Sequence, residues 1–453
     1  TGATAELCGI MLRDSAHIQE FEAEWRNRKA QRSGGEEYQP LYTMQDAEAT
    51  LALFHEVDYG ETVEVGPNIR ARFTDVGHLL GSASIELWVT EGEETRKIVF
   101  SGDIGNTHQP LLRDPQPIKE ADYVVMESTY GDRSHGPRPD YVPALAAVLQ
   151  DTFDRGGNLV IPSFAVGRTQ EMLYFLRQIK EQNLVKGHEN FTVYVDSPMA
   201  VEATQVFKTS WAECYDEEAR TLVMQGVNPI NFRGLKLSLS SDDSKAINFD
   251  SEPKVILSAS GMCDAGRIRH HLKHNLWRPE STVLFVGYQS PGTLGRALVE
   301  GAKEVKLFGE TIEVRCKVQV LAGVSGHADN EGLMNWVKNF ESKPRTVFVT
   351  HGEDEVCDIF ANRLRSELGL AAAAPYNGAE YDLVTGSCLV VGNTQRIAKG
   401  EGGGKKRENP VFRRLLDAGL RLLNIIKAKE GHTNKELARF ASQVEALCDK
   451  WQD

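Results

Sequence analysis

Strand and helix signals alternate along the middle of this 453-residue chain. Four short apolar segments have the composition of buried strands, at residues 158–161, 192–195, 255–257 and 282–286. Helical stretches follow three of them, from residue 168, at 199–210 and at 266–275. Because each strand connects to the next through a helix, this alternation predicts a parallel sheet flanked by helices. We therefore expect an α/β domain in this part of the chain.

Polar side chains stand where other predicted strands end. Apolar runs precede Asp103, Glu127 and His351, while His78 and His327 lie in the glycine-containing turns GHLLG and SGHAD. A lone histidine in such a place is usually a packed or surface residue. Several histidines and carboxylates at strand ends are what a hydrolytic zinc site requires, because imidazole nitrogen and carboxylate oxygen are zinc ligands. The combination predicts a metal-dependent hydrolase.

A series of motifs then identifies a resemblance. In chain order they are GHLLGSA, FSGDIG, ESTYGDR, IPSFAVGRTQE, DSPMA, SASGM, DAGRIRHHLKH, FVGYQ, SGHAD and THGE. Together they resemble the β-CASP branch of the metallo-β-lactamase-fold nucleases, which includes bacterial and archaeal RNA-processing nucleases and the endonuclease of messenger-RNA 3′-end cleavage. The resemblance covers about residues 1–395.

The resemblance implies an α/β fold, a metallo-β-lactamase αββα sandwich with an inserted parallel-sheet β-CASP domain. We expect the two parts of the metallo-β-lactamase domain at residues 1–137 and 319–395 and the β-CASP domain at 138–318. Residues 396–453 are expected to form a basic linker and a helical tail, with a helical run at 411–426 and a helix after Thr433. Self-association or binding of a protein partner is our expectation for this tail.

One family motif is not found in the sequence. The main metal-binding motif, HxHxDH, occurs nowhere in the 453 residues, and the chain begins with Thr1 rather than Met. Residues 3–19 resemble the family helix that follows this motif. We therefore expect an N-terminally truncated chain, with the first strands of the sandwich and HxHxDH upstream of Thr1. The chain as written should then hold little zinc and cleave RNA poorly.

The resemblance also implies residue roles. His78 and His351 are expected to ligate one zinc ion each, and Asp103 is expected to bridge two ions. Glu127 matches the acid that orients a ligating imidazole, and His327 matches the histidine near the scissile phosphate, a phosphate ligand or proton donor. The catalytic set expected from the family is thus His327, Glu127 and Asp103.

Two strand-to-helix turns are typical of phosphate contacts. Ser163 and Arg168 bracket a turn that opens a helix, whose N-terminal amides favour anions, and Arg168 is able to bind phosphate with two hydrogen bonds. Ser260 and Gly261 lie in a turn of small residues that permits close backbone approach. With His327, these residues form the expected RNA-binding set; tight turns without a ligand remain the alternative.

Charge and composition narrow the function further. A formal net charge of −13 argues against a protein that coats nucleic acid indiscriminately, although it permits local positive charge. Residues 267–274, with the sequence RIRHHLKH, are either a helix over the RNA cleft or a solvated helix surface.

The sequence favours a cytoplasmic protein. Its seven cysteines are scattered and lack CxxC spacing. It has no apolar stretch near the ~18–20 residues of a membrane span.

Three functions remain in competition. The first is a metal-dependent RNA hydrolase, an endonuclease, a 5′-exonuclease or both. The second is a catalytically inactive β-CASP scaffold subunit. The third is a lactamase-fold hydrolase of small esters, against which the large insert between Glu127 and His327 argues, because a small substrate needs no second domain.

Overall fold

A computed structural model of the chain describes residues 1–33, 38–136, 139–321, 325–395 and 434–450, together with residues 422, 426 and 429. Residues 1–394 form one compact unit and residues 395–453 a second one. The predicted basic linker lies outside the described residues, as do all but two residues of the helical run at 411–426. In the second unit, α14 covers Asn434–Lys450, where the sequence predicts a helix.

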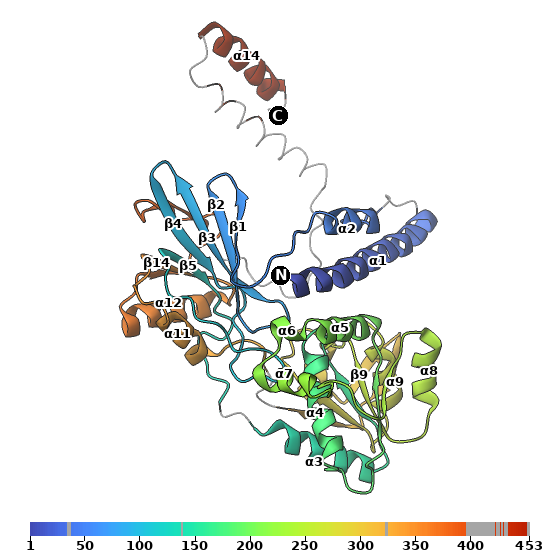
Figure 1. The fold of residues 1–453 in the computed structure, drawn as a ribbon. Coiled ribbons are helices and arrows are strands. Elements are labelled where there is room, and N and C mark those ends of the chain that lie inside the picture. The colour runs from blue at the N-terminus through green and yellow to red at the C-terminus, as the bar shows by residue number, and fades with distance from the viewer. Residues whose placement is uncertain are drawn as a thin grey trace. The chain divides into compact units, whose positions relative to one another are not determined.

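The first sheet has seven strands, in the order β1-β2-β3-β4-β5-β14-β15. The strands are β1 (Thr62–Gly66), β2 (Ile69–Asp75), β3 (Ala83–Glu91), β4 (Glu94–Phe100), β5 (Tyr123–Met126), β14 (Thr346–Val349) and β15 (Ala372–Ala373). Strands β1 to β4 pair as antiparallel neighbours, whereas β4, β5, β14 and β15 run parallel. The sheet thus joins the chain before the insert to the chain after it (Figure 1).

Alternation of side chains along these strands gives the sheet two different faces. Val124, Met126 and Val347 point toward α11 (Asn330–Lys338) and α12 (Asp354–Leu368) and share a buried core with them. On the opposite face Phe100 is 38% exposed and Leu87 is only half-buried. The two-stranded sheet β16 (Glu380–Tyr381) and β17 (Cys388–Val390) covers part of this face, where Tyr381 packs against Phe348 with ring centroids 4.6 Å apart. The face is thus partly open among the described residues.

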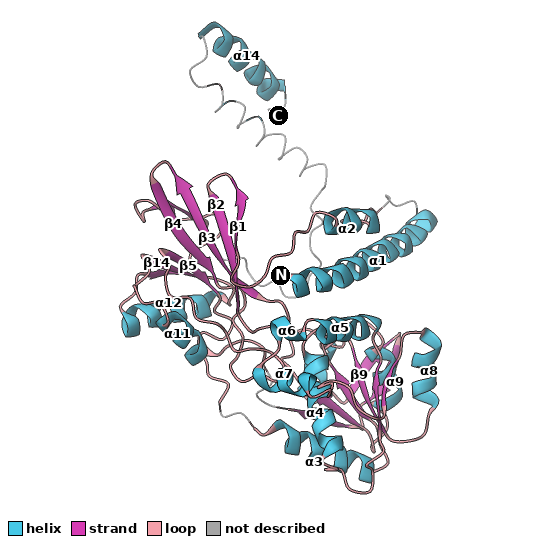
Figure 2. Ribbon diagram, in the orientation of Figure 1, coloured by secondary structure: helices cyan, strands magenta, loops and turns pink. Residues whose placement is uncertain are grey.

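The second sheet has six strands, all parallel, in the order β13-β10-β6-β9-β7-β8. They are β6 (Leu159–Pro162), β7 (Thr192–Val195), β8 (Leu235–Leu237), β9 (Lys254–Ser258), β10 (Thr282–Phe285) and β13 (Lys317–Val320). This is the parallel sheet that the strand and helix alternation predicts. Figure 2 shows the two sheets as separate groups of strands.

Strand β13 belongs to the second sheet. We expected the strand at 318–321 to begin the return to the first domain, and β13 pairs with β10 as an edge strand of the second sheet. We therefore propose that the inserted domain ends after Val320. Local apolar composition predicts that a strand forms, but the sheet it joins depends on which edge is available nearby.

Helices cover both faces of the second sheet, as its strands require. Every residue of β6 and β10 is buried, which is typical of parallel strands with both faces covered. One core lies beneath α3 (Tyr141–Asp154), α4 (Arg168–Glu181) and α5 (Pro198–Thr209), and the other beneath α9 (Ile268–Asn275) and its neighbours.

The remaining elements are short except for the N-terminal helix α1. They are α1 (Gly2–Ser33), α2 (Met44–Leu51), α6 (Trp211–Cys214), α7 (Glu217–Met224), α8 (Ser241–Phe249), α10 (Leu294–Val299), β11 (Glu304–Leu307), β12 (Glu310–Glu313), β16 (Glu380–Tyr381) and β17 (Cys388–Val390). None of the described helices has the length and apolar character needed to cross a membrane.

Candidate metal and substrate site

The predicted site side chains gather at one edge of the first sheet. His78 follows β2, Asp103 follows β4, Glu127 follows β5 and His351 follows β14, while His327 precedes α11. Because β3 runs antiparallel to both β2 and β4, the ends of β2 and β4 lie at the same edge as the ends of parallel β5 and β14. The side chains of these residues, which are far apart in the sequence, thereby become neighbours.

Two glycines allow the turns that place the ligands. Gly77 and Gly102 have φ values of 65° and 61°, in the left-handed region that favours glycine. A Cβ atom at Gly77 would lie 2.3 Å from the carbonyl oxygen of Arg113. Only glycine permits this close approach, which sets the backbone immediately before His78.

Asp103 lies between two histidines. Its Oδ2 is 3.8 Å from Nε2 of His78, and its Oδ1 is 3.3 Å from Nδ1 of His351. Two ligand atoms at 2.0–2.2 Å from a tetrahedral zinc ion are about 3.3–3.6 Å apart, so both separations are near the edge length of a zinc site. The nitrogen and oxygen donors of these three residues therefore fit zinc in chemistry and in spacing.

The carboxylate of Glu127 is buried and has three hydrogen-bonding neighbours. It accepts the backbone amides of Ile104 and Thr129, and Oε2 lies 3.2 Å from Nδ1 of His327. Burial raises the pKa of Glu127, but the hydrogen bond and charge of His327 and the amide hydrogen bonds outweigh it and hold this pKa below its usual value. Glu127 is thus a carboxylate that pairs with His327.

His78 and His327 have opposite pKa shifts although their ring centroids are 4.3 Å apart. Burial and the neighbouring His327 lower the pKa of His78, which favours the neutral imidazole that a metal ligand needs. Burial also lowers the pKa of His327, but Glu127 and the charge of Asp103 raise it above its ordinary value. Of the two rings, His327 is thus the one more readily protonated.

The imidazole beside Glu127 is that of His327. The sequence resemblance predicts that Glu127 orients a ligating imidazole, and the ring it contacts is the one expected at the phosphate. The donor atoms of His327 also lie within 4.8 Å of those of His78 and Asp103, so the expected role of Glu127 stays a prediction. The side chain near His351 is instead Thr129, whose Oγ1 is 3.3 Å from Nδ1 of that ring. Thr129 was not singled out, although it lies in the same ESTYGD motif as Glu127.

The expected phosphate-binding residues are placed differently from one another. Ser163 is buried, and its hydroxyl is 2.8 Å from that of Thr169, so its side chain holds the turn together. Arg168 pairs with Glu171 and, with His78, lines a small cavity of about 40 Å³. Ser260 is half-buried in the turn after β9. The Ser163 hydroxyl is thus buried, whereas Arg168 and Ser260 are each partly exposed.

The histidines of residues 267–274 do not converge on a metal. His271 is fully buried, with Nε2 2.6 Å from Oδ2 of Asp196, and Arg267 donates to the same carboxylate at 2.7 Å. His270 is exposed and its ring stacks on Phe308 with centroids 4.4 Å apart. Part of this basic segment thus stabilises the domain interior, which neither sequence interpretation anticipated.

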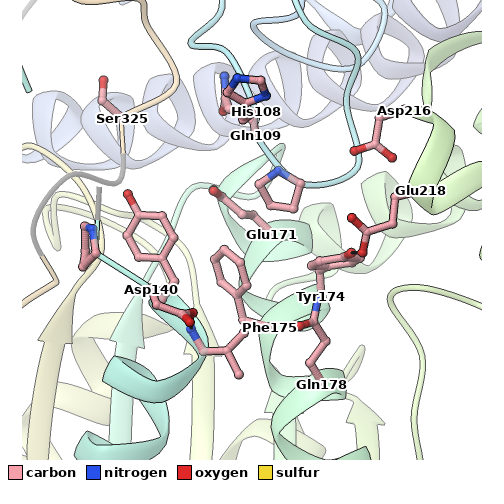
Figure 3. A pocket seen from close by; sticks show the side chains of 14 residues that line it. His108, Gln109, Asp140, Glu171, Tyr174, Phe175, Gln178, Asp216, Glu218 and Ser325 are labelled. Carbon is pink, nitrogen blue, oxygen red and sulfur yellow. Dashed lines mark hydrogen bonds between the residues drawn. The ribbon is translucent and has the colours of Figure 1, made fainter. Parts of the chain in front are cut away.

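A pocket of about 490 Å³ lies next to the candidate site, bordered by the 108–110 loop, α3, α4 and Ser325 (Figure 3). Its lining includes four carboxylates, those of Asp140, Glu171, Asp216 and Glu218. The Tyr174 hydroxyl donates to Glu218 at 2.6 Å. An acidic lining of this kind disfavours phosphate groups, although Glu171 is paired with Arg168.

Comparison with known proteins agrees with this arrangement. Residues 169–298 match the Beta-Casp domain model, and residues 311–375 match a Zn-dependent metallo-hydrolase RNA specificity domain. A protein named as a ribonuclease from Thermus thermophilus is 38% identical over 319 residues, 70% of this chain and 70% of that protein.

Two further relatives are archaeal. The RNase J-like protein of Methanocaldococcus jannaschii is 32% identical over 345 residues, 74% of this chain and 76% of that protein. Transcription termination factor FttA of Pyrococcus abyssi is 32% identical over 357 residues, 77% of this chain but 53% of the factor, so the chain spans about half the length of that relative. By fold and sequence, the chain belongs to the β-CASP family of metallo-β-lactamase-fold nucleases.

Proposed function

We propose that the protein is a metal-dependent RNA hydrolase that cleaves phosphodiesters with a metal-activated water, as an endonuclease, a 5′-exonuclease or both. The observation that carries this proposal is that Asp103 lies between His78 and His351, with the His327–Glu127 pair beside them. The donor atoms of His78, Asp103 and His327 form one group within 4.8 Å, and those of Asp103, Glu127 and His351 form another. The ribonuclease names of two relatives support RNA as the substrate.

In this proposal, the three convergent side chains are metal ligands. His78 and His351 would each hold a zinc ion, and Asp103, which lies between the two rings, would serve both. A bound zinc ion lowers the pKa of a water to about 7 and so supplies hydroxide at neutral pH. Two tetrahedral ions would need more ligands than these three residues supply.

His327 acts on the leaving group. Its raised pKa favours the protonated ring, and Glu127 lies at the Nδ1 side, which leaves the Nε2 side of the imidazole for the substrate. A protonated imidazole there is able to donate a hydrogen bond to a phosphate oxygen or a proton to the leaving oxygen. Arg168, Ser260 and Gly261 contribute contacts to the RNA backbone.

Neither alternative function gains support. A hydrolase of small esters would not need the six-stranded inserted domain, and the relatives are named for RNA cleavage or transcription termination. An inactive scaffold would not require the Asp103 carboxylate to lie between two histidines.

The proposal also covers the cellular location of the protein and the role of its C-terminal tail. We place the protein in the cytoplasm, and we assign the tail containing α14 to self-association or a protein partner. Leu437, Phe440 and Val444 lie along α14 at helical spacing and are only half-buried, which leaves an apolar stripe for contact. Removing residues 396–453 should then lower the molecular mass measured by sedimentation or abolish co-purification of the partner.

The test compares zinc content and cleavage of labelled single-stranded RNA in the full-length protein and in two variants. Asp103→Ala should lose metal and cleavage together, because one carboxylate serves both ions. Asp242→Ala removes an exposed acid of α8 that pairs with Lys245, and it should keep both properties. Undiminished turnover by Asp103→Ala, or no RNA cleavage by the zinc-loaded protein, would disprove the proposed function.

A further inference from the structure

Two exposed aromatic rings lie at the strand-end edge of the second sheet. Phe164 follows β6 and is 47% exposed, and Tyr288 follows β10 and is 53% exposed. Because β6 and β10 are parallel neighbours, both loops leave the sheet at the same edge. Among the described residues, neither ring stacks on another aromatic ring, which leaves ring surface open to a ligand.

Gly261 holds the two aromatic loops in place. A Cβ atom at Gly261 would lie 3.2 Å from Cδ2 and Cε2 of Phe164, so the ring rests directly on the glycine backbone. The Gly261 carbonyl accepts a hydrogen bond from Nε2 of buried Gln289 at 3.0 Å, and the same nitrogen donates to the Tyr288 carbonyl at 3.1 Å. The three loops after β6, β9 and β10 therefore form one connected surface.

This surface continues to the candidate metal site. A Cβ atom at Gly167, in the same loop as Phe164, would lie 2.7 Å from Cδ2 of Leu79, the residue after His78. Arg168, at the end of that loop, lines a cavity together with His78 and Leu79. The aromatic rings thus lie on loops that reach the candidate ligands, with a cationic side chain in the same loop.

The chemistry of this surface fits unpaired nucleotides. Every base has a π-face, so an aromatic ring binds bases by stacking regardless of sequence. Bases within a duplex are already stacked on their neighbours, whereas bases of a single strand are free to splay onto protein rings. We propose that Phe164 and Tyr288 stack bases on one side of the scissile phosphate and so select single-stranded RNA. This inference rests on the proposed function.

Substitutions that keep apolar bulk but remove the ring test the proposal. Phe164→Leu and Tyr288→Leu should each weaken binding of a fluorescent single-stranded RNA of about ten nucleotides by about 5-fold to 150-fold. Phe164→Tyr and Tyr288→Phe keep the rings and should bind as the original protein does. Phe249→Leu removes a ring that is 81% exposed on α8 and is the matched control, with binding unchanged.

Binding is measured by fluorescence anisotropy in a chelator, so that cleavage does not interfere, and cleavage is measured separately with zinc. If both leucine variants bind the single strand within 2-fold of the original protein while it still cleaves RNA, the stacking proposal is wrong and the proposed function stands. If the ring-keeping variants lose binding as fully as the leucine variants, the loops are merely structural and the proposal is again overturned. If the original protein neither binds nor cleaves RNA, the proposed function itself has failed.

Discussion

Replacing Glu127 by glutamine tests the pairing at the centre of the candidate site. The buried carboxylate accepts the amides of Ile104 and Thr129 and pairs with Nδ1 of His327. Each oxygen therefore faces a backbone donor. A glutamine side chain of the same shape has one accepting oxygen and one donating nitrogen, so in either orientation a backbone amide meets a donor.

This mismatch sets the expected loss of stability. One unsatisfied buried donor costs about 1–3 kcal/mol, so Glu127→Gln should lower the free energy of unfolding by that amount. His327 also loses the charge that keeps its proton and the partner that orients its ring. Removing a hydrogen-bond partner that orients a site side chain typically lowers activity by about 10–100-fold. We expect the rate of RNA cleavage to fall by a similar factor.

The assay combines urea unfolding with single-turnover cleavage of single-stranded RNA. Glu120→Gln changes an exposed acid of the same loop region and is the control, expected to stay within about 0.5 kcal/mol of the original protein. Zinc content, measured in both variants, should be unchanged by Glu120→Gln, whereas Glu127 lies within 4.8 Å of the donor atoms of Asp103 and His351, so the zinc content of Glu127→Gln is the control for an effect on the metal. A Glu127→Gln variant as stable and as active as the original protein would refute the pairing.

Two further predictions concern the metal and acid stability. His351→Ala should lower zinc content in the full-length protein, whereas His327→Ala should keep its zinc while cleavage falls by about 10²–10⁴, the usual contribution of a positioned acid; equal loss of zinc in both would contradict the assigned roles. Burial raises the pKa of Glu86, but hydrogen bonds from Arg72, Lys97 and a threonine outweigh it and lower this pKa from 4.5 to about 2. Because the folded pKa is depressed, this stabilisation is present above the unfolded pKa and is lost as pH falls toward about 2. The stability difference between the original protein and Glu86→Gln should be about 3 kcal/mol at pH 7 and fall to about 1.4 kcal/mol at pH 3, measured by urea unfolding, and a pH-independent difference would count against it.

The positions of strands and ligands were predictable because they depend on local patterns. A short apolar run ended by a polar residue identifies β4, β5 and β14, and places Asp103, Glu127 and His351 at their ends. Uninterrupted apolar strands separated by helices predict the parallel sheet, since a strand buried on both faces leaves no position for alternating polar residues. These features require no knowledge of distant parts of the chain.

Which distant groups meet depends on the tertiary structure. Glu127 and His327 are 200 residues apart, and nothing near either one shows that they pair. Ser163 lies in a turn typical of phosphate binding, yet its hydroxyl faces Thr169 in the interior. His271 is one of three neighbouring histidines, and the turn of α9 alone directs it inward to Asp196 while His270 faces outward. These contacts depend on helical phase, on strand order and on the direction of each chain reversal. A change of one residue in phase or register moves a side chain from the solvent face to the core face.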